Sequence, residues 1–303
     1  MKRITLYIIL LSGFACASCD EKITAVLPDA PPVIVIDAFI TTQQMPQTIR
    51  VMKSQPYFEE TLPPGVSGAT VSVSDGVSTY IFTEDPGSPG SYVFDFPDSL
   101  TVGTVYTLSV KIDSEEFTAS SRLGRVPPID SITFEKSTFP GETNKDNFYR
   151  AQFWAKDPDG PGDTYWIRAT KNGVLLNKPS EINIAYDGAF SKGSNFDGFV
   201  FIQPIRNGIN PDNTDDDDSN DDESPYSPGD SVYVELHSLT EASFNYLNEI
   251  AIQTNRPGGF GELFARPLAN VSTNLKNTAV NGTPVVGFFN VASVSVAGKK
   301  FTK

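Results

Sequence analysis

From residue 33 onward, apolar and polar residues alternate in short runs, which is the pattern of half-buried β-strands. In the first part of the chain these runs cover residues 33–40, 49–53, 69–74, 79–83, 91–94, 104–112 and 116–120. Clusters of proline, glycine and aspartate separate the runs and predict tight turns between consecutive strands. Short strands with such regular punctuation predict an immunoglobulin-like β-sandwich over residues 33–125.

A larger β-rich domain is predicted beyond residue 126, where Pro127 and Pro128 favour an extended linker. Further strand-like runs cover residues 132–134, 149–155, 164–169, 198–202, 231–236, 285–291 and 293–296. We therefore expect a mainly β protein in which the sandwich is followed by a larger antiparallel β domain over residues 126–303.

One segment of this second domain has helical rather than strand periodicity, from about residue 240 to residue 254. Thr240 can cap the start of the helix, and Phe244, Leu247 and Ile250 fall on one face. Pro257 follows and cannot continue the helix. The second domain is therefore expected to carry one α-helix, with its apolar face against the sheet.

The N-terminus has the pattern of a bacterial lipoprotein signal peptide over residues 1–18. Lys2 and Arg3 precede an apolar run that is shorter than the roughly 20 residues needed to cross a bilayer. Small residues lead to Cys19, which we expect to be lipidated and followed by a flexible tether up to residue 32. Cys16 occupies the position that usually carries leucine, so an ordinary secretory peptide stays as the alternative.

Composition removes several classes of function. With Cys19 lipidated and Cys16 cleaved off, the mature chain has no disulfide, thiol nucleophile or cysteine metal site. The formal net charge of −14 repels the phosphates of nucleic acid and anionic lipid headgroups, so we expect neither as a partner. The expected membrane contact is the lipid anchor.

A short acidic segment resembles a calcium-binding loop, because Asp157, Asp159 and Asp163 place carboxylates at alternating positions. The match to an EF-hand is poor, since Pro161 stands where a ligand belongs and Arg168 where the bidentate glutamate belongs. The alternative is a tight turn between two strands. We predict no metal site and keep the three aspartates as weak candidates.

Two further features suggest contacts with a partner. Asp215, Asp216, Asp217 and Asp218 lie in an acidic segment over about residues 210–228, which like-charge repulsion should keep as a solvated loop. The alternatives are contact with a basic partner and loose binding of a cation. Phe196 and Phe199 lie in a polar stretch, where aromatic rings are common in interfaces.

Catalytic chemistry finds little support in the sequence. His237 is the only histidine, and no Gly-x-Ser-x-Gly elbow accompanies it. One histidine without a free cysteine also cannot supply the ligands of a zinc site. We predict no catalytic residue, no cofactor and no enzymatic activity, while carboxylates from separate loops leave a surface hydrolase open as an alternative.

Four regions of the chain together carry a family resemblance. They comprise residues 33–41 with 68–75, residues 103–108 with 127–131, residues 157–165, and residues 229–236 with 267–270, 273–274 and 287–293. In this order, along nearly the whole chain, they resemble the DUF4249 lipoproteins of Bacteroidetes. The resemblance implies an outer-membrane lipoprotein that is often encoded beside a TonB-dependent receptor. It implies no particular activity.

The expected function is therefore a non-enzymatic, outer-membrane lipoprotein that acts as an accessory or substrate-capturing subunit beside a TonB-dependent receptor. The alternative is a structural subunit of an outer-membrane assembly or export complex. Asp20 and Glu21, directly after the lipidated cysteine, resemble the signal that sends Bacteroidetes lipoproteins to the cell surface. Display on the outer face is therefore expected, and the partner should be an outer-membrane β-barrel protein.

Overall fold

The computed structural model describes residues 31–56, 59, 61–96, 100–136, 148–212 and 224–302. The chain divides into two units, and the larger one, residues 32–55 with 61–303, holds all the described strands and helices. The predicted signal peptide, Cys19, most of the tether and Asp215 to Asp218 lie outside the described residues. Among the described helices, none is both long enough and apolar enough to span a bilayer.

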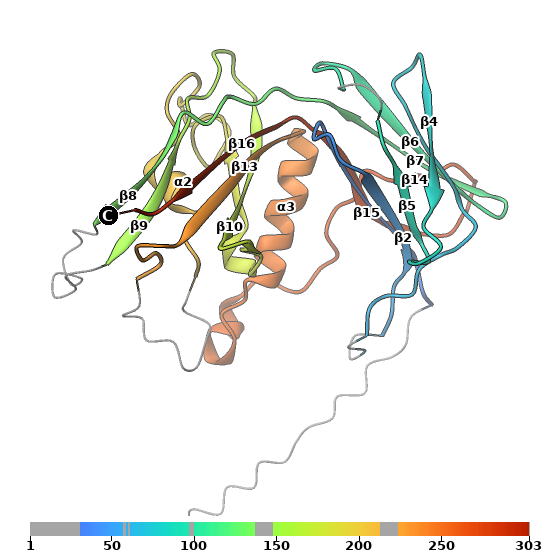
Figure 1. Cartoon of the computed structure of the whole chain (residues 1–303). Coiled ribbons are helices and arrows are strands. Elements are labelled where there is room, and N and C mark those ends of the chain that lie inside the picture. The colour runs from blue at the N-terminus through green and yellow to red at the C-terminus, as the bar shows by residue number, and fades with distance from the viewer. Residues whose placement is uncertain are drawn as a thin grey trace, which may run out of the picture. The chain divides into compact units, whose positions relative to one another are not determined.

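The largest sheet of the described chain has nine strands in the order β14-β7-β6-β3-β4-β5-β2-β1-β15. All neighbours pair antiparallel except β1 and β15, which are parallel (Figure 1). Its strands are β1 (Ile34–Thr41), β2 (Gln47–Lys53), β3 (Thr70–Ser74), β4 (Thr79–Glu84), β5 (Ser91–Phe94), β6 (Val105–Ile112), β7 (Glu115–Arg122), β14 (Lys276–Asn277) and β15 (Val285–Ala292).

This sheet confirms the mainly β prediction but differs in detail from a two-sheet sandwich. Its strands form one hydrogen-bonded path, which nearly closes where the Val291 N–H donates to Ser121 Oγ at 3.1 Å. The sheet also extends beyond residues 33–125, because β14 and β15 come from the end of the chain. A parallel pair of strands requires a long crossover connection. The local strand pattern does not indicate that β15, so distant in the sequence, would pair with β1.

Strand alternation places the first core inside this sheet. Along β1, Ile36, Ala38 and Ile40 are fully buried, together with Phe289 and Val291 of β15. The parallel strands approach closely at Gly287, where an added Cβ would lie 2.0 Å from the Ile36 carbonyl oxygen. Glycine is therefore the residue that this pairing accepts.

A second sheet has the order β11-β10-β13-β16, with β12 also paired to β10, and β8 and β9 form a separate two-stranded ribbon. These strands surround a second buried core rich in aromatic residues, which includes Phe153, Tyr165 and Tyr226. The strands are β8 (Ser131–Lys136), β9 (Tyr149–Trp154), β10 (Thr164–Lys171), β11 (Val174–Leu175), β12 (Asn183–Tyr186), β13 (Ser231–Leu239) and β16 (Val294–Lys300).

The predicted helix is confirmed as α3 (Glu241–Thr254). Thr240 caps it, since its Oγ1 accepts a hydrogen bond from the Ser243 N–H at 3.1 Å, and Phe244 and Leu247 are buried as expected. Two short 3₁₀ turns were not predicted, η1 (Pro179–Glu181) and η2 (Gly259–Phe264).

The predicted strand over residues 198–202 is wrong. The segment forms only an isolated bridge between Val200 and Lys156, and the short helix α2 (Gln203–Asn207) begins directly after it. Pro204, in the first turn of α2, suits a helix start and cannot donate to a sheet ladder.

β15 connects the two cores. Its inward side chains belong to the first core, whereas Phe288 stacks on Tyr246 of α3 with ring centroids 4.5 Å apart. The neighbouring Asn290 is fully buried and accepts a hydrogen bond from Ser243 Oγ at 2.7 Å. Figure 1 shows α3 between β15 and the second sheet, so the helix packs on both.

Candidate functional site

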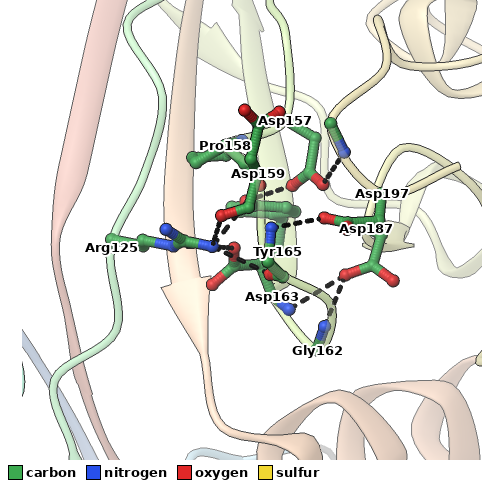
Figure 2. A network of polar contacts seen from close by, with 11 residues as sticks. Arg125, Asp157, Pro158, Asp159, Gly162, Asp163, Tyr165, Asp187 and Asp197 are labelled. Carbon is green, nitrogen blue, oxygen red and sulfur yellow. Dashed lines mark hydrogen bonds and ion pairs between the residues drawn. The ribbon is translucent and has the colours of Figure 1, made fainter.

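Three aspartates converge at one end of the second core. Asp157 follows β9, Asp187 follows β12, and Asp197 lies in the loop between β12 and α2. One carboxylate oxygen from each lies within 4.8 Å of the others (Figure 2). The set has the charge and oxygen donors that a hard cation would require.

Asp157 is the most deeply buried of the three, with only 1% of its surface exposed. Burial raises its pKa to about 6, and the negative charges of Asp163 and Asp187 act in the same direction. Hydrogen bonds from the Tyr165 hydroxyl at 2.6 Å and the Gly198 N–H at 3.1 Å oppose this rise. The two oxygens of Asp157 therefore each accept a hydrogen bond already.

The other two aspartates brace the turn that leads into β10. Asp187 Oδ1 accepts hydrogen bonds from the N–H groups of Gly162 and Asp163 at 2.7 and 3.0 Å. Asp197 Oδ1 accepts one from the Gly160 N–H at 2.9 Å. These carboxylates satisfy backbone N–H groups that the turn leaves unpaired, so they hold the turn in place.

Arg125 supplies the positive charge of the network. Its Nε donates to Asp163 Oδ2 at 2.8 Å, and its Nη2 forms an ion pair with the same oxygen at 2.7 Å. The same Nη2 donates to the carbonyl oxygens of Pro158, Asp159 and Gly160 (Figure 2). One side chain therefore binds the turn at several points.

The structure separates the three aspartates that the sequence suggested as calcium ligands. Asp157 joins the buried group, and Asp163 pairs with Arg125. Asp159 is largely exposed and lies 3.8 Å from the Lys156 ammonium. The partners of Asp157 are Asp187 and Asp197, and no motif spacing in the sequence links these two residues to it.

The chemistry of this group favours bracing a loop. Calcium takes six to eight oxygen ligands, whereas only three carboxylates of the described chain converge here. Both oxygens of Asp157 and one oxygen each of Asp187 and Asp197 already accept hydrogen bonds from the protein. The described contacts join the turn after β9 to the loop after β12. They fix the position of that loop.

The loop held in this way exposes aromatic rings. The carbonyl of Phe199 accepts a hydrogen bond from the Asp157 N–H at 2.9 Å, and that of Phe196 accepts one from Gly188 at 3.2 Å. A Cβ on Gly188 would lie 2.9 Å from the Phe196 carbonyl oxygen, so this close approach also requires glycine. Phe190, Phe196 and Phe199 are all exposed, and we call them the aromatic loop.

His237 is only 4% exposed and lies within β13. Burial lowers its pKa, and its Nε2 lies 3.1 Å from Glu235 Oε2. The hydrogen bond with His237 helps to lower the pKa of Glu235 to about 2, and Gln43 and Arg168 contribute further. This group links β13 to the turn after β1 and presents no accessible imidazole.

Comparison with known proteins places the chain in a family. The family model described as "Domain of unknown function (DUF4249)" matches residues 20–297. The chain belongs to the DUF4249 family. In this DUF4249 protein the match includes the nine-stranded sheet, the second sheet up to the middle of β16, α3, the aspartate group and the aromatic loop. None of the curated proteins searched matches it.

Proposed function

We propose that this DUF4249 protein is a non-enzymatic, lipid-anchored accessory subunit of the outer membrane that binds a TonB-dependent receptor. The signal-peptide pattern and Cys19 support the anchor. The resemblance to Bacteroidetes lipoproteins supports the compartment and the class of partner. The aromatic loop is the observation that carries the proposal of a protein contact.

The aromatic loop has the properties of a recognition surface. Aromatic residues dominate the binding energy of many protein interfaces, provided that they are presented on a rigid frame. Here Phe199 is fixed through its carbonyl and through the neighbouring Gly198 N–H, both of which bind Asp157. The loop can therefore present its rings to a partner at little cost in conformational entropy.

The geometry of the titratable groups supports a non-enzymatic role. A catalytic residue must touch the substrate, but His237 is buried and paired with Glu235. Asp157, whose pKa is raised to about 6, is also buried, and its carboxylate is bonded to Tyr165 and Gly198. A shifted pKa of this kind also arises in purely structural networks.

Co-purification from detergent-solubilised outer membranes tests the proposal. The full chain with a C-terminal affinity tag is compared with Phe196→Ser/Phe199→Ser and with the control Val77→Ser/Ile81→Ser. The control residues are also large, apolar and exposed, but they lie on the β3–β4 hairpin. We expect an outer-membrane β-barrel receptor to co-purify with the wild type and the control, and at least tenfold less with the loop variant.

The partner that is recovered decides between the proposals. A TonB-dependent receptor supports the accessory role, whereas an assembly or export barrel supports the alternative of a structural subunit. If no barrel protein is recovered with the wild type, the proposed partner class is wrong. Equal recovery with the Phe196→Ser/Phe199→Ser variant would show that the aromatic loop is not the contact.

A further inference from the structure

A second exposed apolar surface lies beyond the C-terminal end of α3. It consists of Phe260, Leu263, Phe264 and Leu268, which are 77%, 75%, 80% and 68% exposed, and we call it the apolar tip. Single exposed apolar residues are common, but several large ones in one short segment indicate an interaction site. Within the tip, the ring centroids of Phe260 and Phe264 lie 5.7 Å apart. The tip belongs to η2 and the residues after it, separate from the aromatic loop.

Polar contacts fix the segment that carries the tip. The Arg256 side chain pairs with Glu262, and its Nη1 donates to the Arg266 carbonyl oxygen at 2.9 Å. The segment after the tip returns to α3, where the Ala269 N–H donates to Gln253 Oε1 at 3.1 Å. The segment is therefore closed on itself through Arg256 and joined to α3 through Gln253, while its apolar side chains remain in solvent.

The local charge indicates which surface the tip would meet. The protein as a whole has a formal charge of −14, but the segment around the tip carries Arg256 and Arg266 against Glu262 alone. Glu262 is paired with Arg256, and Arg266 has no ion-pair partner among the described residues. Segments that enter the interface of a bilayer with anionic headgroups combine apolar side chains with basic residues. The apolar tip and the adjacent Arg266 form a small combination of this kind.

We propose that the apolar tip inserts into a lipid bilayer and gives the protein a second membrane contact beside its lipid anchor. The inference rests on the proposed anchoring at Cys19. A chain from residue 19 to β1 spans at most about 50 Å when fully extended. The anchor would therefore keep the folded body close to the bilayer, where even weak insertion becomes effective through the high local concentration.

Vesicle binding tests the tip without the anchor. The probe protein is the mature chain from residue 19 with Cys19→Ser, which lacks no residue of the described fold. We expect it to co-sediment with vesicles of phosphatidylethanolamine and phosphatidylglycerol, and more weakly with phosphatidylcholine vesicles. The variant Phe260→Ser/Leu263→Ser/Phe264→Ser should bind at least tenfold less, whereas Val77→Ser/Ile81→Ser should bind like its parent.

Fluorescence locates the contact. With Phe264→Trp, vesicles should shift the tryptophan emission to shorter wavelength, and brominated acyl chains should quench it. With Val77→Trp, another exposed position, vesicles should change neither signal beyond the background of Trp154 and Trp166. Equal quenching at both positions would overturn the proposal, because it would mean nonspecific adsorption.

Two other outcomes would also overturn the inference. One is that the parent protein does not bind either type of vesicle. The other is that it sediments as a dimer which the triple serine substitution dissociates, because the tip would then contact a second copy of the chain. Receptor co-purification is measured without vesicles, so failure here leaves the proposed receptor binding standing, and the reverse also holds.

Discussion

Replacing Asn290 by alanine should lower the free energy of unfolding more than the replacement of an exposed asparagine, because the Asn290 amide joins elements of both sheets. Asn290 is fully buried in β15, on the side that faces α3. Its Oδ1 accepts from Ser243 Oγ at 2.7 Å and from Ser121 Oγ at 3.5 Å, and its Nδ2 donates to the Ser238 carbonyl at 3.3 Å. One amide therefore joins β7, β13 and α3 to β15.

The magnitude follows from the groups that lose a partner. A buried polar group without a hydrogen bond costs about 1–3 kcal/mol, and alanine would leave the Ser238 carbonyl without this donor and Ser243 Oγ without this acceptor. Ser243 Oγ retains its contact with Thr240 Oγ1 at 2.7 Å, which lessens the loss. We therefore expect the free energy of unfolding to fall by about 2–4 kcal/mol, and the melting temperature by roughly 5–10 °C.

Urea denaturation followed by circular dichroism measures this change, with Asn248→Ala as the matched control on the exposed side of α3. Asn290→Asp retains the volume but buries a charge and removes the donor to Ser238, so it should destabilise at least as strongly as alanine. A loss below about 0.5 kcal/mol for Asn290→Ala, the usual range for surface substitutions, would refute the assigned role of the amide.

Three further predictions concern the site, the anchor and the acidic segment. Because the folded protein raises the pKa of Asp157 from 3.8 to about 6, this residue binds a proton between these pH values only in the folded state. Wild type should therefore lose about 2–3 kcal/mol of stability relative to Asp157→Asn as the pH rises from 4 to 7, measured by denaturation at each pH, and a constant difference would contradict the pKa. Cys19→Ala should release the protein into soluble fractions and abolish labelling by a clickable palmitate analogue, and continued labelling would exclude Cys19 as the modified residue. Replacing residues 213–223 by a short glycine–serine linker should change the melting temperature by less than 2 °C or so, given the usual effect of surface changes, and a larger loss would mean that the acidic segment packs into the fold.

Local patterns in the sequence predicted most individual elements. Alternating residues give β1 and β6 because one face of each strand is buried, and Thr240 with its apolar repeat gives α3. The pairing of β1 with β15 was not predictable, because nothing local specifies which distant strand completes a sheet. The strand predicted over residues 198–202 is wrong because the local pattern itself misleads. The apolar run there forms a loop with one isolated bridge and leads into α2.

The aspartate group shows the same limit for a site. The acidic, glycine-rich surroundings of Asp157 are visible in the sequence and indicate a candidate site. Its companions, Asp187 and Asp197, follow a different strand and reach it only because β12 pairs with β10. Carboxylates on separate loops carry no spacing rule, so their meeting becomes apparent only from the tertiary fold.

The contacts of Asp157 explain why a carboxyl group is buried at this position. Its backbone N–H donates to the Phe199 carbonyl and its carboxylate accepts from the Gly198 N–H, so one residue holds two consecutive residues of the segment that carries the aromatic loop. An apolar residue of similar size would fill the space but leave the Gly198 N–H and the Tyr165 hydroxyl without an acceptor. The unfavourable burial of this carboxyl group is thus offset by its hydrogen bonds, which also hold the loop in one conformation. A surface that is ordered before binding loses less conformational entropy when it meets a partner.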